Sequence, residues 1–188
     1  MEETIIKTYC DYVKTLSDDN VHKLYHDNEY GFAIEDDNGL FARLVLEINQ
    51  AGLSWDMILK KKKNFFKAYD NFEISKVAKY KEKQVERLLN DAGIIRNRLK
   101  INAAIENAKK ILELQKEFGS FKKWIEHHHP LTKEEWVKVF KKDFKFTGGE
   151  IVNEFLMSTG YLQGAHAPSC AVYKKLAKQK PMWMRGKV

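Results

Sequence analysis

The chain has 188 residues, of which 44% are hydrophobic, and this is enough to bury the core of a single domain. It contains 33 Lys and Arg against 26 Asp and Glu, and the formal net charge of +7 favours a polyanionic partner without identifying one. Cys10 and Cys170 are the only cysteines, which disfavours a disulfide-rich secreted fold but leaves one bridge between them open.

Apolar residues recur mostly at helical spacing. Between residues 40 and 48 they repeat at three and four positions and share one face, which predicts a helix that ends near Gly52. Ser54 is the predicted N-cap of the next helix, with an acid in its first turn. The lysine run 60–63 is predicted to form the solvated end of that helix.

Further helix starts follow along the chain. Ser75, Ser120 and Thr132 have the character of N-caps, and Thr132 with Glu135 fits a capping box. A long helix is predicted from about residue 97 to 117. Only three prolines occur, and no alternating strand pattern, repeat or low-complexity linker is evident. We therefore predict an all-α protein with a single domain over residues 1–188.

Residues 85–111 have the pattern of a helix, a tight turn and a second helix. Gly93 in the turn can adopt a positive φ, and the amides that open the second helix form a phosphate site. Arg96, Arg98 and Lys100 add positive charge, so Gly93, Ile95, Arg96 and Arg98 are predicted to hold the DNA backbone independently of its sequence. The alternative left open is that Gly93 caps an ordinary helical hairpin and the arginines form a solvated face.

Three segments of the sequence together resemble a known family. Residues 25–31 (YHDNEYG), 47–55 (EINQAGLSW) and 91–96 (DAGIIR) resemble the signature blocks of the DNA-3-methyladenine glycosylase I family, which belongs to the helix-hairpin-helix DNA glycosylases. The blocks occur in the same order and at similar separations, and the resemblance covers nearly the whole chain. It implies two helical lobes with a substrate pocket between them and a helix-hairpin-helix element at about 85–111.

The resemblance also implies an activity. Such an enzyme flips the damaged nucleotide out of alkylated double-stranded DNA and hydrolyses the bond between 3-methyladenine and its sugar, as a monofunctional glycosylase in base excision repair. The residue matching Glu47 accepts hydrogen bonds from the lesion, and those matching Tyr25 and Trp55 flank its ring. Because the lesion is cationic and leaves readily, a buried carboxylate and aromatic faces suit it without a strong general acid.

Each pocket assignment has a structural alternative. An arbitrary helical glutamate such as Glu47 usually faces solvent, whereas Trp55 and Tyr25 would be ordinary core residues. The chain also departs from the family, because Tyr12 and Tyr30 stand where tryptophan is usual and still count as pocket residues. His22 stands where tyrosine is usual, so the range of lesions stays open.

Two further features follow from the flipping hypothesis. The loop from Gln50 through Gly52 to Leu53 lies between two predicted helices, and we expect it to fill the gap that the flipped base leaves in the duplex. Its alternative is a plain interhelical turn. Related glycosylases carry an aspartate downstream of the hairpin, but no equivalent is found after Ile111, so no general base is assigned.

Cys10, His26, His166 and Cys170 form a two-cysteine, two-histidine set. Their spacing alone is unlike a zinc finger and is weak support for a metal. The resemblance implies that they clip the termini, at about 10–26 and 166–170, around one structural zinc per chain. Asp27, Asn28 and Glu29 are expected to brace His26 rather than to catalyse. The adjacent histidines 127–129 are expected to form a polar loop and not to chelate.

Two competing hypotheses remain. A helix-hairpin-helix module that binds DNA or a damaged base without catalysis explains the charge and the hairpin equally well. A glycosylase-like scaffold that binds a damaged or free nucleobase without cleaving it is the second. No signal peptide or bilayer-length apolar run is found, so we expect a cytoplasmic monomer with no membrane partner.

Overall fold

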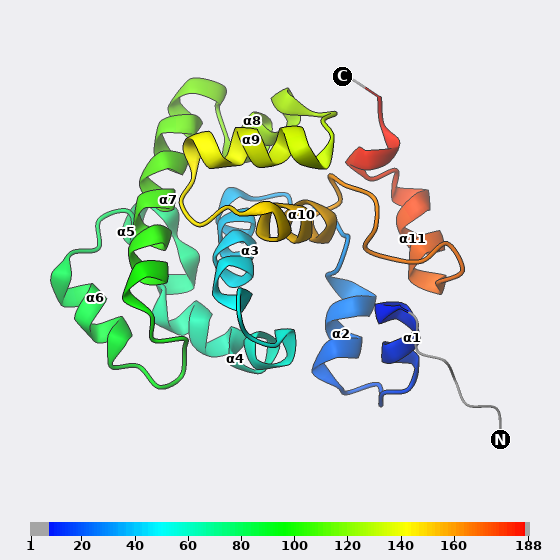
Figure 1. The fold of residues 1–188 in the computed structure, drawn as a ribbon, viewed down its shortest axis with the longest axis horizontal. Helices are drawn as coiled ribbons and strands as arrows, with labels where there is room; N and C mark the ends of the chain where they lie inside the picture. Colours follow the sequence, from blue (N-terminus) through cyan, green and yellow to red (C-terminus); the bar gives the residue numbers. More distant parts are fainter. Residues whose placement is uncertain (1–7, 187–188) are drawn as a thin grey trace. The chain divides into compact units, whose positions relative to one another are not determined.

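The computed structural model of the protein describes residues 8–186, and all regular structure in this range is helical. The prediction of an all-α fold is confirmed for these residues (Figure 1). The chain divides into two compact units. Unit 2 is the continuous stretch Ile34–Phe155, and unit 1 combines the residues up to Ala33 with those from Leu156 onwards.

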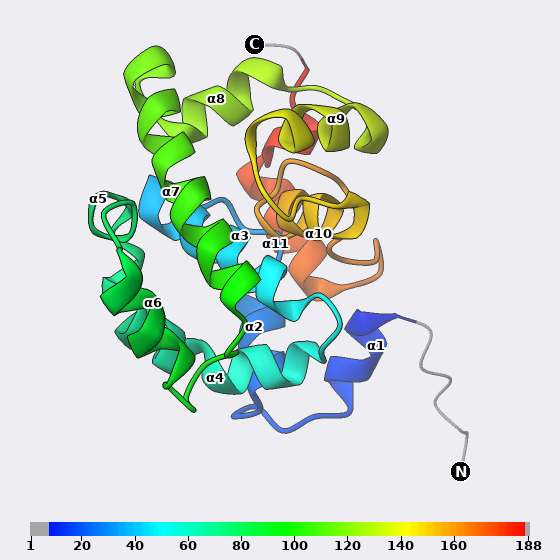
Figure 2. The ribbon, with the colours of Figure 1, turned by 60° about the vertical axis from the view of Figure 1, so that its left-hand side comes forward.

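Unit 2 holds most of the helices. They are α3 (Asp37–Gln50), α4 (Trp55–Ala68), the 3-10 helix η1 (Asp70–Phe72), α5 (Ile74–Val77), α6 (Glu82–Leu89), α7 (Arg98–Phe118), α8 (Phe121–His128), α9 (Lys133–Asp143) and most of α10 (Gly149–Ser158). Figure 2 shows α7, the longest helix, running beside α5 and α6. The long helix predicted at 97–117 is therefore confirmed.

Helix α3 forms the centre of unit 2. It contacts α4, α5, α7 and α8, and the side chains from Leu40 to Asn49 are all buried. A helix that is apolar almost all round is expected in such a position. Two charged residues, Arg43 and Glu47, are nevertheless buried with it.

Most predicted helix starts are confirmed, because capping depends on local sequence. Ser54, Ser120 and Thr132 each accept a hydrogen bond from an amide in the first turn of their helix, and Thr132 with Glu135 forms the capping box. Two predictions were wrong. Ser75 lies inside α5, whose N-cap is Glu73, and the lysine run 60–63 lies in the middle of α4, which continues to Ala68.

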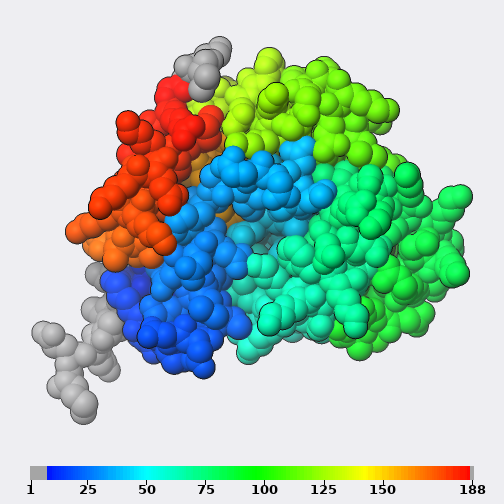
Figure 3. Space-filling view, turned by 180° about the vertical axis from the view of Figure 1, so that it is seen from behind, coloured from blue at the N-terminus to red at the C-terminus, as the bar shows by residue number. Residues whose placement is uncertain are grey.

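Unit 1 joins the two ends of the described chain. It contains α1 (Tyr9–Lys14), α2 (Val21–Asn28), α11 (Ala171–Gln179) and the 3-10 helix η2 (Met182–Met184). Figure 3 shows the blue N-terminal helices beside the orange segment that leads into α11. Segments about 150 residues apart in sequence therefore share one core, in which Cys10, His26 and His166 are buried. Among residues 8–186, no helix is long and apolar enough to cross a membrane.

Candidate functional site

Glu47 is the carboxylate of unit 2 whose environment differs most from water. It lies near the end of α3 with 5% of its surface exposed. Burial raises the pKa of Glu47 to about 8, with the Arg43 guanidinium opposing the shift and Glu154 adding to it. The solvent-facing alternative is therefore excluded for this residue. A buried carboxyl that ionises near neutral pH is typical of binding and catalytic sites.

The loop after α3 is a closed turn. The Leu53 amide donates to the Gln50 carbonyl over 2.7 Å, and the Gln50 side-chain amide donates to the Leu53 carbonyl over 2.9 Å. Gly52 at the tip has a φ of +81°, and no atom lies within 4 Å of where its Cβ would be. Trp55 follows at the first position of α4 and is half-buried. The turn therefore has an exposed, uncrowded backbone at Gly52, five residues after Glu47.

Lys100 does not contribute surface charge, contrary to our expectation. Its side chain is buried, and its Nζ donates to the carbonyls of Asn49 and Ala51 over 3.0 and 2.7 Å. Burial lowers the pKa of Lys100. The last carbonyls of α3 have no partner within the helix, so an ammonium group from α7 satisfies them. Lys100 thus ties the start of α7 to the loop that follows Glu47.

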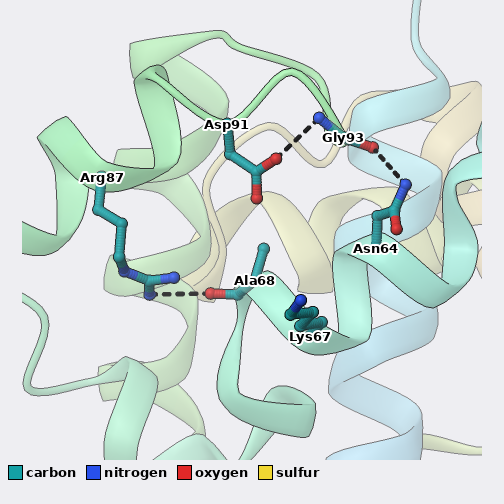
Figure 4. Close-up of a pocket in the computed structure, with 6 residues that line it drawn as sticks. All are labelled: Asn64, Lys67, Ala68, Arg87, Asp91 and Gly93. Atoms are coloured by element: carbon teal, nitrogen blue, oxygen red, sulfur yellow. Dashed lines mark hydrogen bonds between the residues drawn. The ribbon is translucent and has the colours of Figure 1, made fainter.

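The predicted hairpin is present between α6 and α7, but Gly93 is used differently from the prediction. It does not have a positive φ. Its amide donates to Asp91 Oδ1 over 2.7 Å, and Asn64 of α4 donates to its carbonyl (Figure 4). A Cβ at Gly93 would lie 2.9 Å from Asp91 Oδ1 and 3.2 Å from Asn64 Cβ. Glycine at this position is explained by the close approach of Asp91 and Asn64, and not by a positive φ.

Gly93→Ala is therefore expected to destabilise the protein by about 1–2 kcal/mol, because the new methyl group displaces Asp91 or Asn64. Urea unfolding measures the change. Gly148→Ala is the matched control, since no atom lies within 4 Å of its Cβ position and its φ is not positive, and it should stay within about 0.5 kcal/mol. Equal stability of the two variants would contradict the packing explanation.

The hairpin and α4 line an open polar pocket of about 240 Å³, formed by Asn64, Lys67, Ala68, Arg87, Asp91 and Gly93 (Figure 4). The two predicted arginine contacts differ in their surroundings. Arg98 forms ion pairs with Glu82 and Glu86 of α6, whereas Arg96 is exposed in the turn. The charge of Arg98 is thus already compensated by acids, so Arg96 is the freer of the two to meet a phosphate.

A second helix-loop-helix in unit 2 was not predicted. It consists of α9, residues 144–148 and α10. Buried Asn107 of α7 binds both the amide and the carbonyl of Lys145, over 2.7 and 3.1 Å. Phe146 has a φ of +57° and is 44% exposed, an uncommon state for an aromatic residue. The Gly148–Gly149 pair at the start of α10 was the signal in the sequence that could have indicated this loop.

Unit 1 gathers the aromatic residues that the sequence indicated. Tyr25 and Tyr30 are buried, with ring centroids 5.4 Å apart. Tyr12 stacks on Tyr9 and meets the His22 ring edge-on at 5.5 Å. The Tyr9 hydroxyl lies 3.0 Å from His22 Nδ1. Tyr9 was missed by sequence reasoning, although it stands three residues before Tyr12 on the same helical face.

Cys10, His26, His166 and Cys170 meet in unit 1, all buried, with their ligand atoms within 4.8 Å of one another. His166 Nδ1 lies 3.1 Å from His26 Nε2 and 3.7 Å from Cys10 Sγ, and Cys170 Sγ lies 3.7 Å from His26 Nε2. For zinc bonds of about 2.0 Å to nitrogen and 2.3 Å to sulfur, a tetrahedron has edges of about 3.3 Å (N to N) and 3.5 Å (N to S). The four residues therefore fit a tetrahedral metal ion.

The surroundings of the cluster are also organised. Burial lowers the pKa of His166, which favours the neutral imidazole that binds metals. Burial acts to raise the pKa of Asp27, but hydrogen bonds from His26 and Lys23 outweigh it and hold the pKa below its ordinary value. Asp27 does brace His26 as expected. The histidine run differs from expectation, because His127 and His128 form the last turn of α8 instead of a loop.

Comparison with known proteins identifies the family. The sequence model of methyladenine glycosylases matches residues 15–139, which is more than half of the chain. The chain belongs to the methyladenine glycosylase family. It is 34% identical to DNA-3-methyladenine glycosylase 1 of Escherichia coli K12, covering 84% of this chain and 94% of the relative. It is 30% identical to DNA-3-methyladenine glycosylase of Haemophilus influenzae Rd, covering 87% and 96%.

A solved relative supports the same assignment. The structure of 3-methyladenine DNA glycosylase I from Staphylococcus aureus, described in terms of 3-methyladenine recognition, is 31% identical and covers 83% of this chain and 93% of its own, with a TM-score of 0.75. The family match includes His26, Glu47, Trp55 and the hairpin, whereas Cys10, His166 and Cys170 lie outside residues 15–139. The assignment of these four residues as possible metal ligands is therefore supported mainly by their geometry.

Proposed function

We propose that the protein is a monofunctional DNA glycosylase that flips 3-methyladenine out of alkylated double-stranded DNA and hydrolyses its bond to the sugar. The observation that carries the proposal is the buried, weakly ionised Glu47, within one loop of Trp55, in a chain that belongs to the methyladenine glycosylase family. The relatives that carry this activity in their names align over most of the chain.

The chemistry of the lesion suits this carboxyl group. N3-methylated deoxyadenosine is cationic, so a carboxylate in a poorly solvated site attracts it much more strongly than water would allow. Trp55 is proposed to supply an aromatic face for stacking and cation-π attraction, and Tyr12, Tyr25 and Tyr30 keep the pocket roles that the resemblance implies. The methylated base is already a good leaving group, so recognition and desolvation suffice and no strong general acid is needed.

DNA contacts are assigned to exposed backbone of unit 2. The turn with Gln50, Gly52 and Leu53 is proposed to occupy the gap left by the flipped nucleotide. The hairpin residues Gly93, Ile95, Arg96 and Arg98 are proposed to hold the same duplex through its phosphates. The loop with Lys145 and Phe146 is the additional candidate that the structure supports, because it is exposed and held rigidly by Asn107.

The four-residue cluster of unit 1 is proposed to hold one zinc ion. Two thiolates and two imidazoles are a common ligand set for structural zinc, and four protein ligands leave no position for a reacting water. The ion would therefore stabilise unit 1 and take no part in base release. Its holders are Cys10 and His26 near the start of the chain and His166 and Cys170 near its end.

The proposed activity is tested by incubating the protein with methylated duplex DNA and identifying the free bases by chromatography. We expect release of 3-methyladenine and much slower release of 7-methylguanine, whose measurement also defines the lesion range. DNA binding without release of any base would instead support the non-catalytic module. Release of a base other than 3-methyladenine would retain the enzyme class and overturn the substrate.

A further inference from the structure

Each histidine of the four-residue cluster has two ring nitrogens, and only one can face a metal. The nitrogen that faces away from the metal carries the proton when it donates a hydrogen bond to an acceptor, and the other nitrogen then keeps its lone pair for the metal. The two histidines of the cluster have different acceptors at this second nitrogen, and both acceptors belong to unit 1.

His26 is oriented by its neighbour in sequence. Its Nδ1 lies 2.6 Å from Asp27 Oδ1. An ionised carboxylate only accepts hydrogen bonds, so Nδ1 must carry the proton and Nε2 keeps its lone pair. Nε2 is the atom that faces Cys170 and His166. The second carboxylate oxygen, Oδ2, accepts from Lys23 Nζ over 3.0 Å, which fixes the carboxylate in turn.

His166 is oriented by the backbone. Its Nε2 lies 2.7 Å from the Tyr30 carbonyl oxygen, which also only accepts, so Nε2 carries the proton and Nδ1 keeps its lone pair. The lone pairs of His26 Nε2 and His166 Nδ1 then face each other across 3.1 Å with no proton between them. Two acceptors repel at this distance, and a cation between them relieves the repulsion.

We infer that Asp27 is the positioning residue of the metal site: by holding the proton on His26 Nδ1 it presents Nε2 to the ion, while the Tyr30 carbonyl presents Nδ1 of His166. This inference rests on the proposed zinc site. It assigns one ligand nitrogen to each ring and gives Lys23 the role of anchoring Asp27.

The affinity test uses the full chain loaded with Co²⁺, whose visible absorption reports thiolate ligation, and with Zn²⁺ in competition with a chelator. Asp27→Ala should weaken metal binding roughly 10- to 100-fold. Asp27→Asn should bind metal no better than Asp27→Ala, because Lys23 takes the amide oxygen and the amide NH2 then donates to Nδ1, which places the ring proton on Nε2. Asp18→Asn is the matched control, since Asp18 contacts Lys23 at 3.8 Å and does not reach His26.

The outcomes separate the inference from the metal site itself. Wild-type affinity in Asp27→Ala would overturn the role of Asp27 alone, and an Asp27→Asn variant that binds metal as tightly as the wild type would overturn the tautomer argument. Failure of the wild type to bind one equivalent of metal would overturn both the site and the inference. Long-range ¹H–¹⁵N spectra of the zinc-loaded protein read the tautomers directly, and we expect protonated Nδ1 in His26 and protonated Nε2 in His166.

Discussion

Replacing Glu47 with glutamine is expected to lower 3-methyladenine release from methylated duplex DNA by on the order of 100-fold, the value of a hydrogen bond to a charged group. Glutamine keeps the shape of the side chain and removes only its charge. The measurement is single-turnover base release, with affinity for undamaged duplex measured in parallel and expected to be unchanged. Glu117→Gln, at the exposed end of α7, is the matched control.

The raised pKa of Glu47 also predicts a pH dependence. With a pKa of about 8, the free protein carries the neutral acid in most molecules at pH 7, and the carboxylate forms as the pH rises. Release of the cationic base at limiting enzyme should therefore increase between about pH 7 and 9 and then level off. Glu47→Gln should show a flat profile over this range. A flat profile for the wild type would contradict the proposed role of the carboxylate.

Stability should change with pH in the opposite direction. Between the ordinary glutamate pKa of 4.5 and the folded value of about 8, the folded protein keeps a proton that the unfolded chain has lost. The free energy of unfolding therefore falls as pH rises through this window, by up to a few kcal/mol from this group. Urea unfolding at pH 5 and pH 8.5 should show that Glu47→Gln gains stability relative to the wild type at the higher pH.

Cys170→Ser is the variant with the largest expected effect on stability. Loss of one ligand should release the metal and lower the melting temperature by on the order of 10 °C, since each kcal/mol shifts a chain of this size by about 2–4 °C. Metal content is measured alongside, and chelator should destabilise the wild type while leaving the variant unchanged. Base release at 25 °C should survive, because the ion is proposed to take no part in the reaction.

The control for this prediction compares each cysteine variant with the double variant, because both cysteines are proposed to bind the same ion. Cys10→Ser should cost as much as Cys170→Ser, and the double variant little more than either, because one lost ligand already opens the site. Additive losses would show that the two cysteines stabilise unit 1 by packing alone. A wild type without bound metal would reject the zinc assignment directly.

Features determined by neighbouring residues could be predicted from the sequence. The helical class, the long α7 and the caps at Ser54, Ser120 and Thr132 depend on residues a few positions apart. Ser75 was misassigned because α5 begins one residue earlier, at Ile74, whose amide donates to the side chain of distant Asn38.

Features that depend on distant partners could not be predicted in this way. Lys100 has the sequence context of a surface lysine, and the carbonyls that accept hydrogen bonds from its buried ammonium group lie about 50 residues earlier. The charge of Arg98 is compensated by two glutamates of α6, and this depends on how α6 packs beside α7. The two ends of the metal cluster are more than 130 residues apart, so its spacing was uninformative and only the resemblance suggested it. The roles of the remaining pocket and DNA-contact residues stay predictions.

The Lys100 ammonium has a consequence for how damage is searched. It fastens the start of α7 to the end of α3, so two hydrogen bonds tie the helix that follows the hairpin to the turn that follows Glu47. A rigid probing surface needs no refolding at each base step of the duplex. Translocation is then limited by the electrostatic hold on phosphates, and the rate of search should respond to salt concentration more than to temperature.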